Sequence, residues 1–149
     1  MKAGIVRLML LTALLGAVSV ATADTGEQVF AQHCAVCHQA EAQGMAGLAP
    51  PLKGSQWIRF ARQREYIPGV PMVGMFGSLA LENGTFTGAM PTQNRLSDEE
   101  IAAVINYLFK QVNHIEDWVD VSTIEIAELR KNPPTVAKLR ALRKQALEK

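Results

Sequence analysis

The sequence contains the pentapeptide Cys34-Ala35-Val36-Cys37-His38, which includes both cysteines of the 149-residue chain. Residues three apart lie on the same side of a helix, about one turn from each other. Two thiols at this spacing can add to the two vinyl groups along one edge of a porphyrin, and the next histidine can offer a ring nitrogen to the iron. Cys-x-x-Cys-His is the attachment signature of c-type haem. The motif therefore predicts one haem c, bound covalently by Cys34 and Cys37, with His38 as an axial iron ligand.

The cysteine pair alone has other interpretations. A Cys-x-x-Cys pair can be a redox-active dithiol or half of a zinc site, and an exported pair can close as a disulfide. The sequence before Cys34 shows no βαβ pattern of a thioredoxin-like fold, and no second cysteine pair exists to complete a zinc site. We therefore favour haem attachment.

Residues 1–23 have the three parts of a secretory signal peptide. Lys2 and Arg7 give a positive start, residues 8–20 carry no charge, and Ala21-Thr22-Ala23 forms a small-x-small cleavage site. The uncharged stretch is shorter than the ~20 residues needed to cross a bilayer, which favours cleavage after Ala23 over an uncleaved anchor. Export agrees with the haem motif, because c-type haem is attached outside the cytoplasm in bacteria. We predict a periplasmic protein whose membrane contact is at most peripheral.

The composition excludes several classes of protein. Hydrophobic residues make up 48% of the chain, charged residues 19%, and the formal net charge is +1. These values indicate neither disorder nor a nucleic-acid partner. Two cysteines cannot form a multi-disulfide scaffold, and three histidines are too few for a multi-metal site.

The charges are unevenly placed along the chain. Residues 98–128 contain eight acids and one base, whereas residues 130–149 contain seven bases and one acid. Such polarity can orient redox partners during encounter, although ordinary solvated helix faces would give the same pattern. The basic segment can dock on an acidic enzyme, lie on anionic lipid or pack on its own acidic segment. We favour enzyme docking or self-packing over lipid, because its apolar stripe is narrow and lacks large aromatic residues.

The periodicity predicts a mainly α protein with a small β-hairpin. A first helix is expected over 25–38, opened by a capping box of Thr25 and Gln28, and a second over 57–66. Prolines and glycines then break the pattern, so that residues 72–80 are expected to form a short helix or an irregular loop. Two strand-like runs flank Asn83-Gly84, the strongest short hairpin signal.

The second half of the chain is expected to be helical. A capping box of Ser97 and Glu100 opens a helix that continues to Val112, with one apolar face. Ser122 or Thr123 can cap a short helix that ends near Arg130, and a basic helix follows Pro133-Pro134. We divide the chain into a signal peptide (1–23), a haem domain (24–113) and a C-terminal extension with a basic helix (114–149).

The chain offers several candidates for the second axial ligand of the iron. Apart from those in the signal peptide, the methionines are Met45, Met72, Met75 and Met90. Methionine more often fills a core than binds iron. Gly88-Ala89-Met90-Pro91, however, is expected in an irregular loop before a capped helix, where a loop can carry a thioether over the ring. We predict Met90 as the ligand, ahead of Met72 and Met75, and with His33 and His114 as weaker candidates.

These motifs resemble those of the class I cytochromes c over residues 25–112. The spacing Gly26-x-x-x-Phe30-x-x-x-Cys34 is similar to the family's first helix, in which the glycine lets the last helix cross closely. Val104 and Tyr107 match the partner positions on that last helix. The resemblance implies a cytochrome c-like helical domain around one covalent haem. It also implies that the Pro50 carbonyl accepts a hydrogen bond from the ligand histidine, and it supports Met90 as the distal ligand.

A finer resemblance is to small cytochromes that accompany periplasmic dehydrogenases. The string Gly54-Ser55-Gln56-Trp57, the hairpin before Met90 and the capped segment ending in Arg130 are similar to theirs, but the basic tail after Pro134 is longer. The resemblance implies a periplasmic dehydrogenase as electron donor and an oxidase or another cytochrome as acceptor.

Histidine and methionine on opposite faces of the iron favour the ferrous state and leave no open site for a substrate. We therefore predict a one-electron carrier rather than an enzyme, with Phe30, Leu52, Trp57, Val104 and Leu108 around the ring. Trp57 and Tyr107 can bind a haem propionate, although we favour a core role for each. The alternatives are a haem enzyme or gas-binding protein with an open iron site, and a structural haem-bearing subunit tethered to a larger complex by its tail.

Overall fold

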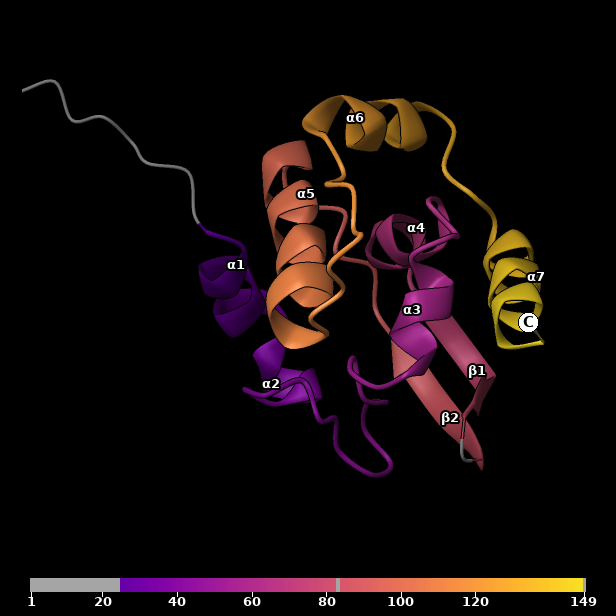
Figure 1. Ribbon diagram of the computed structural model, residues 1–149. Coiled ribbons are helices and arrows are strands. Elements are labelled where there is room, and N and C mark those ends of the chain that lie inside the picture. The colour runs from indigo at the N-terminus through magenta and orange to yellow at the C-terminus, as the bar shows by residue number, and fades with distance from the viewer. Residues whose placement is uncertain (1–24, 83, 149) are drawn as a thin grey trace, which may run out of the picture.

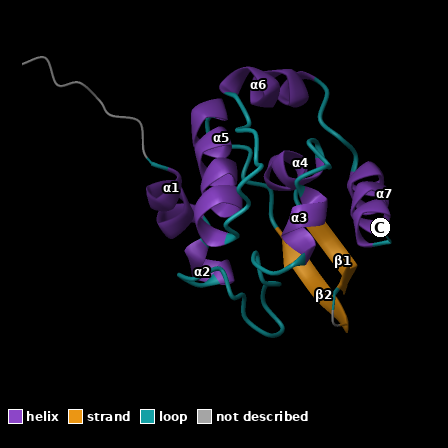
Figure 2. Cartoon of the chain, in the orientation of Figure 1, coloured by secondary structure: helices purple, strands orange, loops and turns teal. Residues whose placement is uncertain are grey.

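The computed structural model describes residues 25–82 and 84–148, so the predicted signal peptide lies outside the described residues. Helices dominate this part of the chain, and its single sheet has two strands (Figures 1 and 2). In chain order the elements are α1 (Gly26–His33), α2 (Ala35–His38), α3 (Gln56–Phe60), α4 (Tyr66–Val73), β1 (Met75–Leu81), β2 (Gly84–Met90), α5 (Asp98–Tyr107), the π-helical turn η1 (Leu108–Val112), α6 (Thr123–Lys131) and α7 (Val136–Leu147).

Both predicted capping boxes are confirmed, and the cap predicted at Ser122 or Thr123 is a third capping box, made by Ser122. The Thr25 hydroxyl accepts from the Gln28 N–H while the Gln28 side chain accepts from the Thr25 N–H. Ser97 and Glu100 make the same pair of bonds at the start of α5, and Ser122 and Glu125 at the start of α6. Each pair satisfies two N–H groups that the first turn of a helix leaves without partners. These local bonds explain why three helix starts could be read from the sequence.

The helices of the first half are shorter than predicted. The helix expected over 25–38 is two helices, because the backbone at Cys34 (φ −115°, ψ −38°) leaves the helical path between α1 and α2. The helix expected over 57–66 ends at Phe60, and the next one starts only at Tyr66.

Helix α4 contradicts the prediction that prolines and glycines interrupt this region. Pro68 is its third residue, where the missing N–H has no partner within a helix in any case. Gly69 permits a close approach of α7, since a Cβ at this position would lie 2.6 Å from Cγ of Pro134 and 2.8 Å from Cδ2 of Leu139. Tertiary packing therefore compensates for the poor helix propensity of this segment.

The hairpin is present but longer than predicted. The strands pair in antiparallel register from Met75 with Met90 to Leu81 with Gly84. The expectation of a short helix or an irregular loop over 72–80 is therefore wrong from Met75 onward. Met90 ends β2 and does not lie in an irregular loop, because it keeps its ladder partner on β1. Gly74, with φ 78°, makes the turn from α4 into β1.

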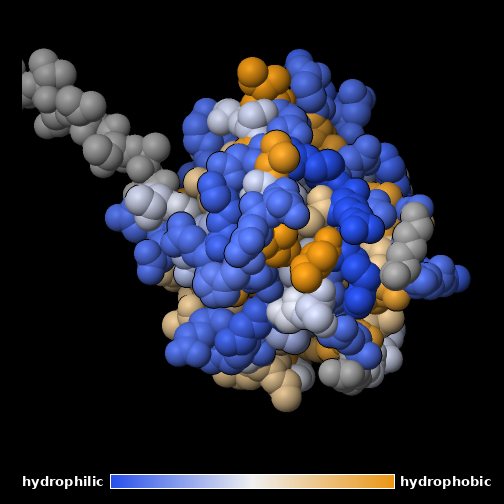
Figure 3. Space-filling model, viewed as in Figure 1, coloured by the Kyte–Doolittle hydropathy of each residue, from blue (hydrophilic) through white to orange (hydrophobic). Residues whose placement is uncertain are grey.

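The core lies between α1, α4, α5 and the aromatic residues of α3 and η1. Its largest fully buried side chains are Phe30, Phe60, Phe109, Ile101, Ile105, Ile126, Leu139 and Val29. The surface seen in Figure 3 is mainly hydrophilic with small hydrophobic patches, one of them over α6, where Ile124 is 75% exposed. In the described part of the chain no helix is both long enough and apolar enough to span a membrane.

Helix α7 packs on the rest of the protein and runs beside α3, α4 and β1. Thr135 caps its start, and Leu139, Arg143 and Ala146 are its buried residues. Their spacing places them on one face of the helix. Most of the other basic residues of α7 lie on its exposed side, as expected for a helix that packs on its own domain.

Candidate functional site

A cleft with a volume of about 300 Å³ opens between α2, α4, α5 and the hairpin. Its walls are mainly apolar. Helix α4 contributes Tyr66, Ile67 and Val70. The face of the hairpin that points into the cleft carries Met75, Leu79, Phe86 and Met90, which alternation along two strands places together. An apolar cleft of this kind accepts a large flat hydrophobic group.

The cysteines of the sequence motif lie at the edge of this cleft. Cys34 and Cys37 both line it, both are partly exposed, and they do not form a disulfide with each other. Burial, together with the neighbouring Cys37, raises the pKa of Cys34 to about 11. A thiol that stays protonated is a poor nucleophile toward disulfides, which argues against a reactive dithiol.

His38 is buried in the cleft and is oriented by a main-chain oxygen. Its Nδ1 atom lies 2.9 Å from the carbonyl oxygen of Pro50. Because a carbonyl can only accept, Nδ1 must carry the hydrogen, and the lone pair of the neutral ring is then on Nε2. Burial lowers the pKa of His38 and keeps the ring neutral, although the bond to Pro50 acts in the opposite direction. A neutral imidazole with a fixed tautomer is the state that binds a metal.

The four candidate methionines differ in their position relative to the cleft. Met75 and Met90 line the cleft, whereas Met72 is buried outside it and Met45 is 46% exposed. The main chain around Met90 lies close to the end of α4. A Cβ at Gly74 would lie 2.8 Å from the Met90 carbonyl oxygen, and the Thr92 hydroxyl donates to the carbonyl of Met72 over 2.7 Å.

The two aromatic residues proposed to bind a propionate differ in position. Trp57 lines the cleft, is 2% exposed, and its Nε1–H has no partner among the described residues. Tyr107 is not among the residues that line the cleft. It packs at the α1–α5 crossing, with its ring centroid 5.7 Å from that of Phe30. Phe30 does not line the cleft either, whereas Leu52, Val104 and Leu108 do.

The residues of the cleft fit a haem. An apolar slot carries two thiols at its edge, a neutral imidazole inside it and two thioethers on the facing hairpin. A buried N–H without a partner is costly, and a carboxylate of the bound group would supply the acceptor that Trp57 lacks. The arrangement therefore defines a protein of the c type, which binds its haem covalently.

The contribution of α4 to this site was not evident from the sequence. Tyr66, Ile67 and Val70 follow the i, i+1, i+4 spacing of an apolar helix face, which was the available signal. Pro68 and Gly69 lie between these residues and made the segment look like a break rather than a helix.

Comparison with known proteins gives the family. The family model described as cytochrome c matches residues 23–111. The chain is 34% identical over 137 residues to a cytochrome c-552 of Thermus thermophilus, and the match covers 89% of this chain and 91% of that protein. It is 35% identical over 96 residues to cytochrome c6 of Bryopsis maxima, covering 64% and 96%. Over 89 residues it is 34% identical to the cbb3-type cytochrome c oxidase subunit CcoP of Rhodobacter capsulatus, covering 59% and 29%.

The chain belongs to the cytochrome c family. It is a monohaem class I cytochrome c, related to cytochromes c-552 and c6, and it carries haem c covalently on Cys34 and Cys37. Its function is to carry electrons between redox partners, and it is not an enzyme.

Proposed function

We propose that this cytochrome is a periplasmic carrier that passes single electrons from a dehydrogenase toward the respiratory chain, with His38 and Met90 as the axial ligands of its iron. The observation that carries the proposal is the placement of these two residues in one cleft, beside the haem-binding cysteines. When bound, the haem supplies a one-electron ferric/ferrous couple, whose potential a thioether ligand raises.

The protein contributes orientation to this chemistry. The Pro50 carbonyl holds the His38 ring so that Nε2 is free to bind. Two residues after Met90, the Thr92 hydroxyl is bonded to the Met72 carbonyl, and the ladder of β1 and β2 holds Met90 itself along the strand. Ligands held in this way need little rearrangement when the oxidation state changes.

The protein also keeps water away from the ring. Leu79 and Phe86 of the hairpin, with Val104 and Leu108 on the facing side, give the cleft an apolar lining. A low local dielectric disfavours the more highly charged ferric state. We therefore expect a positive reduction potential, as is typical of a carrier that delivers electrons to an oxidase.

The cleft is open on the side of the cysteines, which supports electron exchange at that edge. Val36 and Leu48 both line the cleft and are 75% and 46% exposed. We propose this edge as the contact surface for redox partners, whose interfaces with such carriers are small and short-lived. The similarity to a subunit of a cbb3-type oxidase supports an acceptor in the respiratory chain.

The position of α7 supports self-packing of the basic tail rather than a tether to a larger complex, although its main neighbours lie outside the acidic segment (98–128) predicted from the sequence. Its buried face is occupied by α3, α4 and β1 of the same chain. Export and cleavage after Ala23 belong to the same proposal, and they place the haem where it can be attached. N-terminal sequencing of protein from a periplasmic fraction tests both.

The test of the ligand assignment is a visible spectrum of protein matured in a periplasm that attaches haem c. The oxidised protein is expected to show the weak long-wavelength sulfur-to-iron band, and the reduced protein is expected not to bind carbon monoxide readily. Met90→Ala should abolish the band, whereas Met72→Ala, outside the cleft, is the matched control that keeps it. Loss of the band in Met75→Ala but not in Met90→Ala would assign the ligand to Met75 instead.

A further inference from the structure

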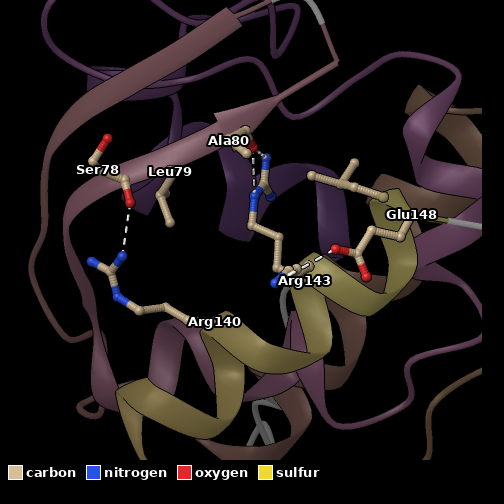
Figure 4. Close-up of a pocket in the computed structure, with 8 residues that line it drawn as sticks. Ser78, Leu79, Ala80, Arg140, Arg143 and Glu148 are labelled. Carbon is tan, nitrogen blue, oxygen red and sulfur yellow. Dashed lines mark hydrogen bonds and ion pairs between the residues drawn. The ribbon is translucent and has the colours of Figure 1, made fainter.

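The arginines of α7 bind the free edge of the hairpin. Strand β1 pairs with β2 along one edge, and its other edge faces a groove beside α7 (Figure 4). Arg140 donates to the carbonyls of Ser78, over 2.7 Å, and of Phe76. Arg143 donates twice to the carbonyl of Ala80, over 2.8 and 2.6 Å. Alternate carbonyls of a strand point the same way, so two arginines one turn apart satisfy three of them.

Arg143 differs from Arg140 in being buried. It is 8% exposed, and its guanidinium carbon lies 5.0 Å from the ring centroid of Phe60 and 5.9 Å from that of Tyr66. Its Nη1 atom donates to the Tyr66 hydroxyl over 2.8 Å. Its polar contacts in the described chain are thus a carbonyl and a phenol, both uncharged.

No carboxylate of the described residues forms an ion pair with Arg143. The acids beside this face of α7 are occupied elsewhere, since Glu148 pairs with Lys144 at 3.6 Å and Glu65 pairs with Lys138. Burial raises the pKa of the Tyr66 phenol above its ordinary value despite the nearby arginines, so the phenol stays neutral and does not cancel the charge. A guanidinium is always protonated, and its positive charge is therefore uncompensated within this part of the protein.

The charge lies directly behind the wall of the haem cleft. Tyr66, which accepts a bond from Arg143, is one of the residues that line the cleft. Leu79, which lines it from the hairpin, is also a wall of the groove that holds Arg143. A single layer of side chains therefore separates the buried cation from the cleft that would hold the haem. Charges act strongly over such a layer, because it excludes water.

We propose that Arg143 raises the reduction potential of the haem by placing a buried positive charge behind the Tyr66 side of the cleft. The inference rests on the proposed function as an electron carrier. Reduction adds one electron to the haem iron and moves no proton, so it lowers the positive charge of the site by one. A fixed cation nearby destabilises the ferric form more than the ferrous form and shifts the equilibrium toward reduction.

The experiment compares reduction potentials of the holoprotein, measured in equilibrium with a redox mediator. Arg143→Met keeps an unbranched, mainly apolar side chain in the packed site but removes the charge. It should lower the equilibrium constant for reduction on the order of tenfold, which is 59 mV for a one-electron couple. Arg143→Lys keeps the charge and should retain most of the potential. Arg140→Met also removes bonds to the free edge of β1, but at a partly exposed position, and it should leave the potential close to that of the wild type.

Three results would overturn the proposal: an unchanged potential in Arg143→Met, an equal fall in Arg143→Lys, or an equal fall in Arg140→Met. The last two would assign the effect to a loosened hairpin. If Arg143→Met does not mature, Arg143→Gln keeps hydrogen-bond donors for Ala80 without the charge, and the same fall is expected of it. Absence of the sulfur-to-iron band in the wild type would instead contradict the proposed function.

Discussion

Gly26 of α1 lies so close to Ala103 of α5 that a Cβ at Gly26 would be 2.1 Å from the Ala103 carbonyl oxygen and 2.7 Å from Cβ of Tyr107. One turn further along α1, Phe30 packs against the ring of Tyr107. The crossing of these helices supports the segment that holds the haem-binding cysteines. The family resemblance implies that the last helix passes close to this glycine. In the structure Gly26 lies against the main chain of α5, and a side chain at this position would disturb the contact.

We expect Gly26→Ala to destabilise the holoprotein by about 1–3 kcal/mol, the usual cost of forcing extra atoms into a packed contact. The gain in helix propensity from alanine, about 1 kcal/mol, offsets only part of this cost. Thermal unfolding followed by far-UV circular dichroism measures the change. Gln32→Ala, on the exposed face of α1, is the control and should stay within about 0.5 kcal/mol of the wild type. Equal stabilities of the two variants would mean that the crossing can relax.

Leu139 gives a second test, because it anchors α7 against Gly69. The side chain is fully buried, and its Cδ2 atom would lie only 2.8 Å from a Cβ at Gly69. We expect Leu139→Ala to lower the free energy of unfolding by about 2–5 kcal/mol, the range for a buried leucine truncated to alanine. Denaturant unfolding of the holoprotein measures this loss. Leu142→Ala, on the same helix but only half-buried, should cost clearly less, and the reverse order would show that α7 packs differently.

The parts of the fold that the sequence predicted well are those determined by local chemistry. The bonds of Ser97 with Glu100 join residues three apart, so the start of α5 can be read without knowledge of the rest of the chain. The cysteine motif is local in the same sense, since its chemistry requires a fixed spacing. Met90 was placed among the ligand candidates from its neighbours alone, although it lies in a strand.

The parts that the sequence did not predict depend on contacts between distant residues. Helix α4 tolerates its prolines and Gly69 because Pro134 and Leu139, some 65 residues later, pack against it. The sequence did not show which distant residues would surround a basic residue on the buried face of α7. Arg143 is buried because Ala80 and Tyr66 satisfy its donors, and those partners are 63 and 77 residues away.

Glu125 gives a prediction about pH. Its carboxylate accepts from Arg64 at 2.7 Å and from the Ser122 N–H at 2.9 Å, and these bonds, that to Arg64 foremost, lower its pKa. A carboxyl whose pKa is lower in the folded than in the unfolded state stabilises the fold at any pH above its unfolded pKa of about 4.3. This contribution disappears as the pH falls through the folded pKa. The effect is small because the side chain is about half exposed.

We therefore expect Glu125→Gln to be less stable than the wild type near pH 7. The two proteins should become equally stable only once the pH is below the lowered pKa of folded Glu125, where both side chains are uncharged. Glutamine can still accept from the Ser122 N–H, so the substitution tests the charge and keeps the helix cap. Thermal unfolding as a function of pH measures the difference. The same substitution in an Arg64→Gln background is the control, in which the difference at pH 7 should largely vanish.

Trp57 and Trp118 form a matched pair for testing the propionate contact. The Nε1–H of Trp57 has no partner among the described residues and its ring lines the cleft, whereas the Nε1–H of Trp118 donates to the Asn106 side chain over 2.9 Å. Donation to a carboxylate stabilises its ionised form. If the indole of Trp57 donates to a haem propionate, Trp57→Phe should raise the pKa of that propionate.

The readout is the reduction potential as a function of pH. Protonation of a propionate makes the potential rise as the pH falls, and in Trp57→Phe that rise should begin at a higher pH than in the wild type. Trp118→Phe also breaks an indole hydrogen bond, but outside the cleft, so it should reduce stability without moving the profile. An unmoved profile in Trp57→Phe would make Trp57 a packing residue, with water as the acceptor for its buried N–H. A profile that moves equally in both variants would reflect a general loosening of the core, because only one of these indoles faces the haem.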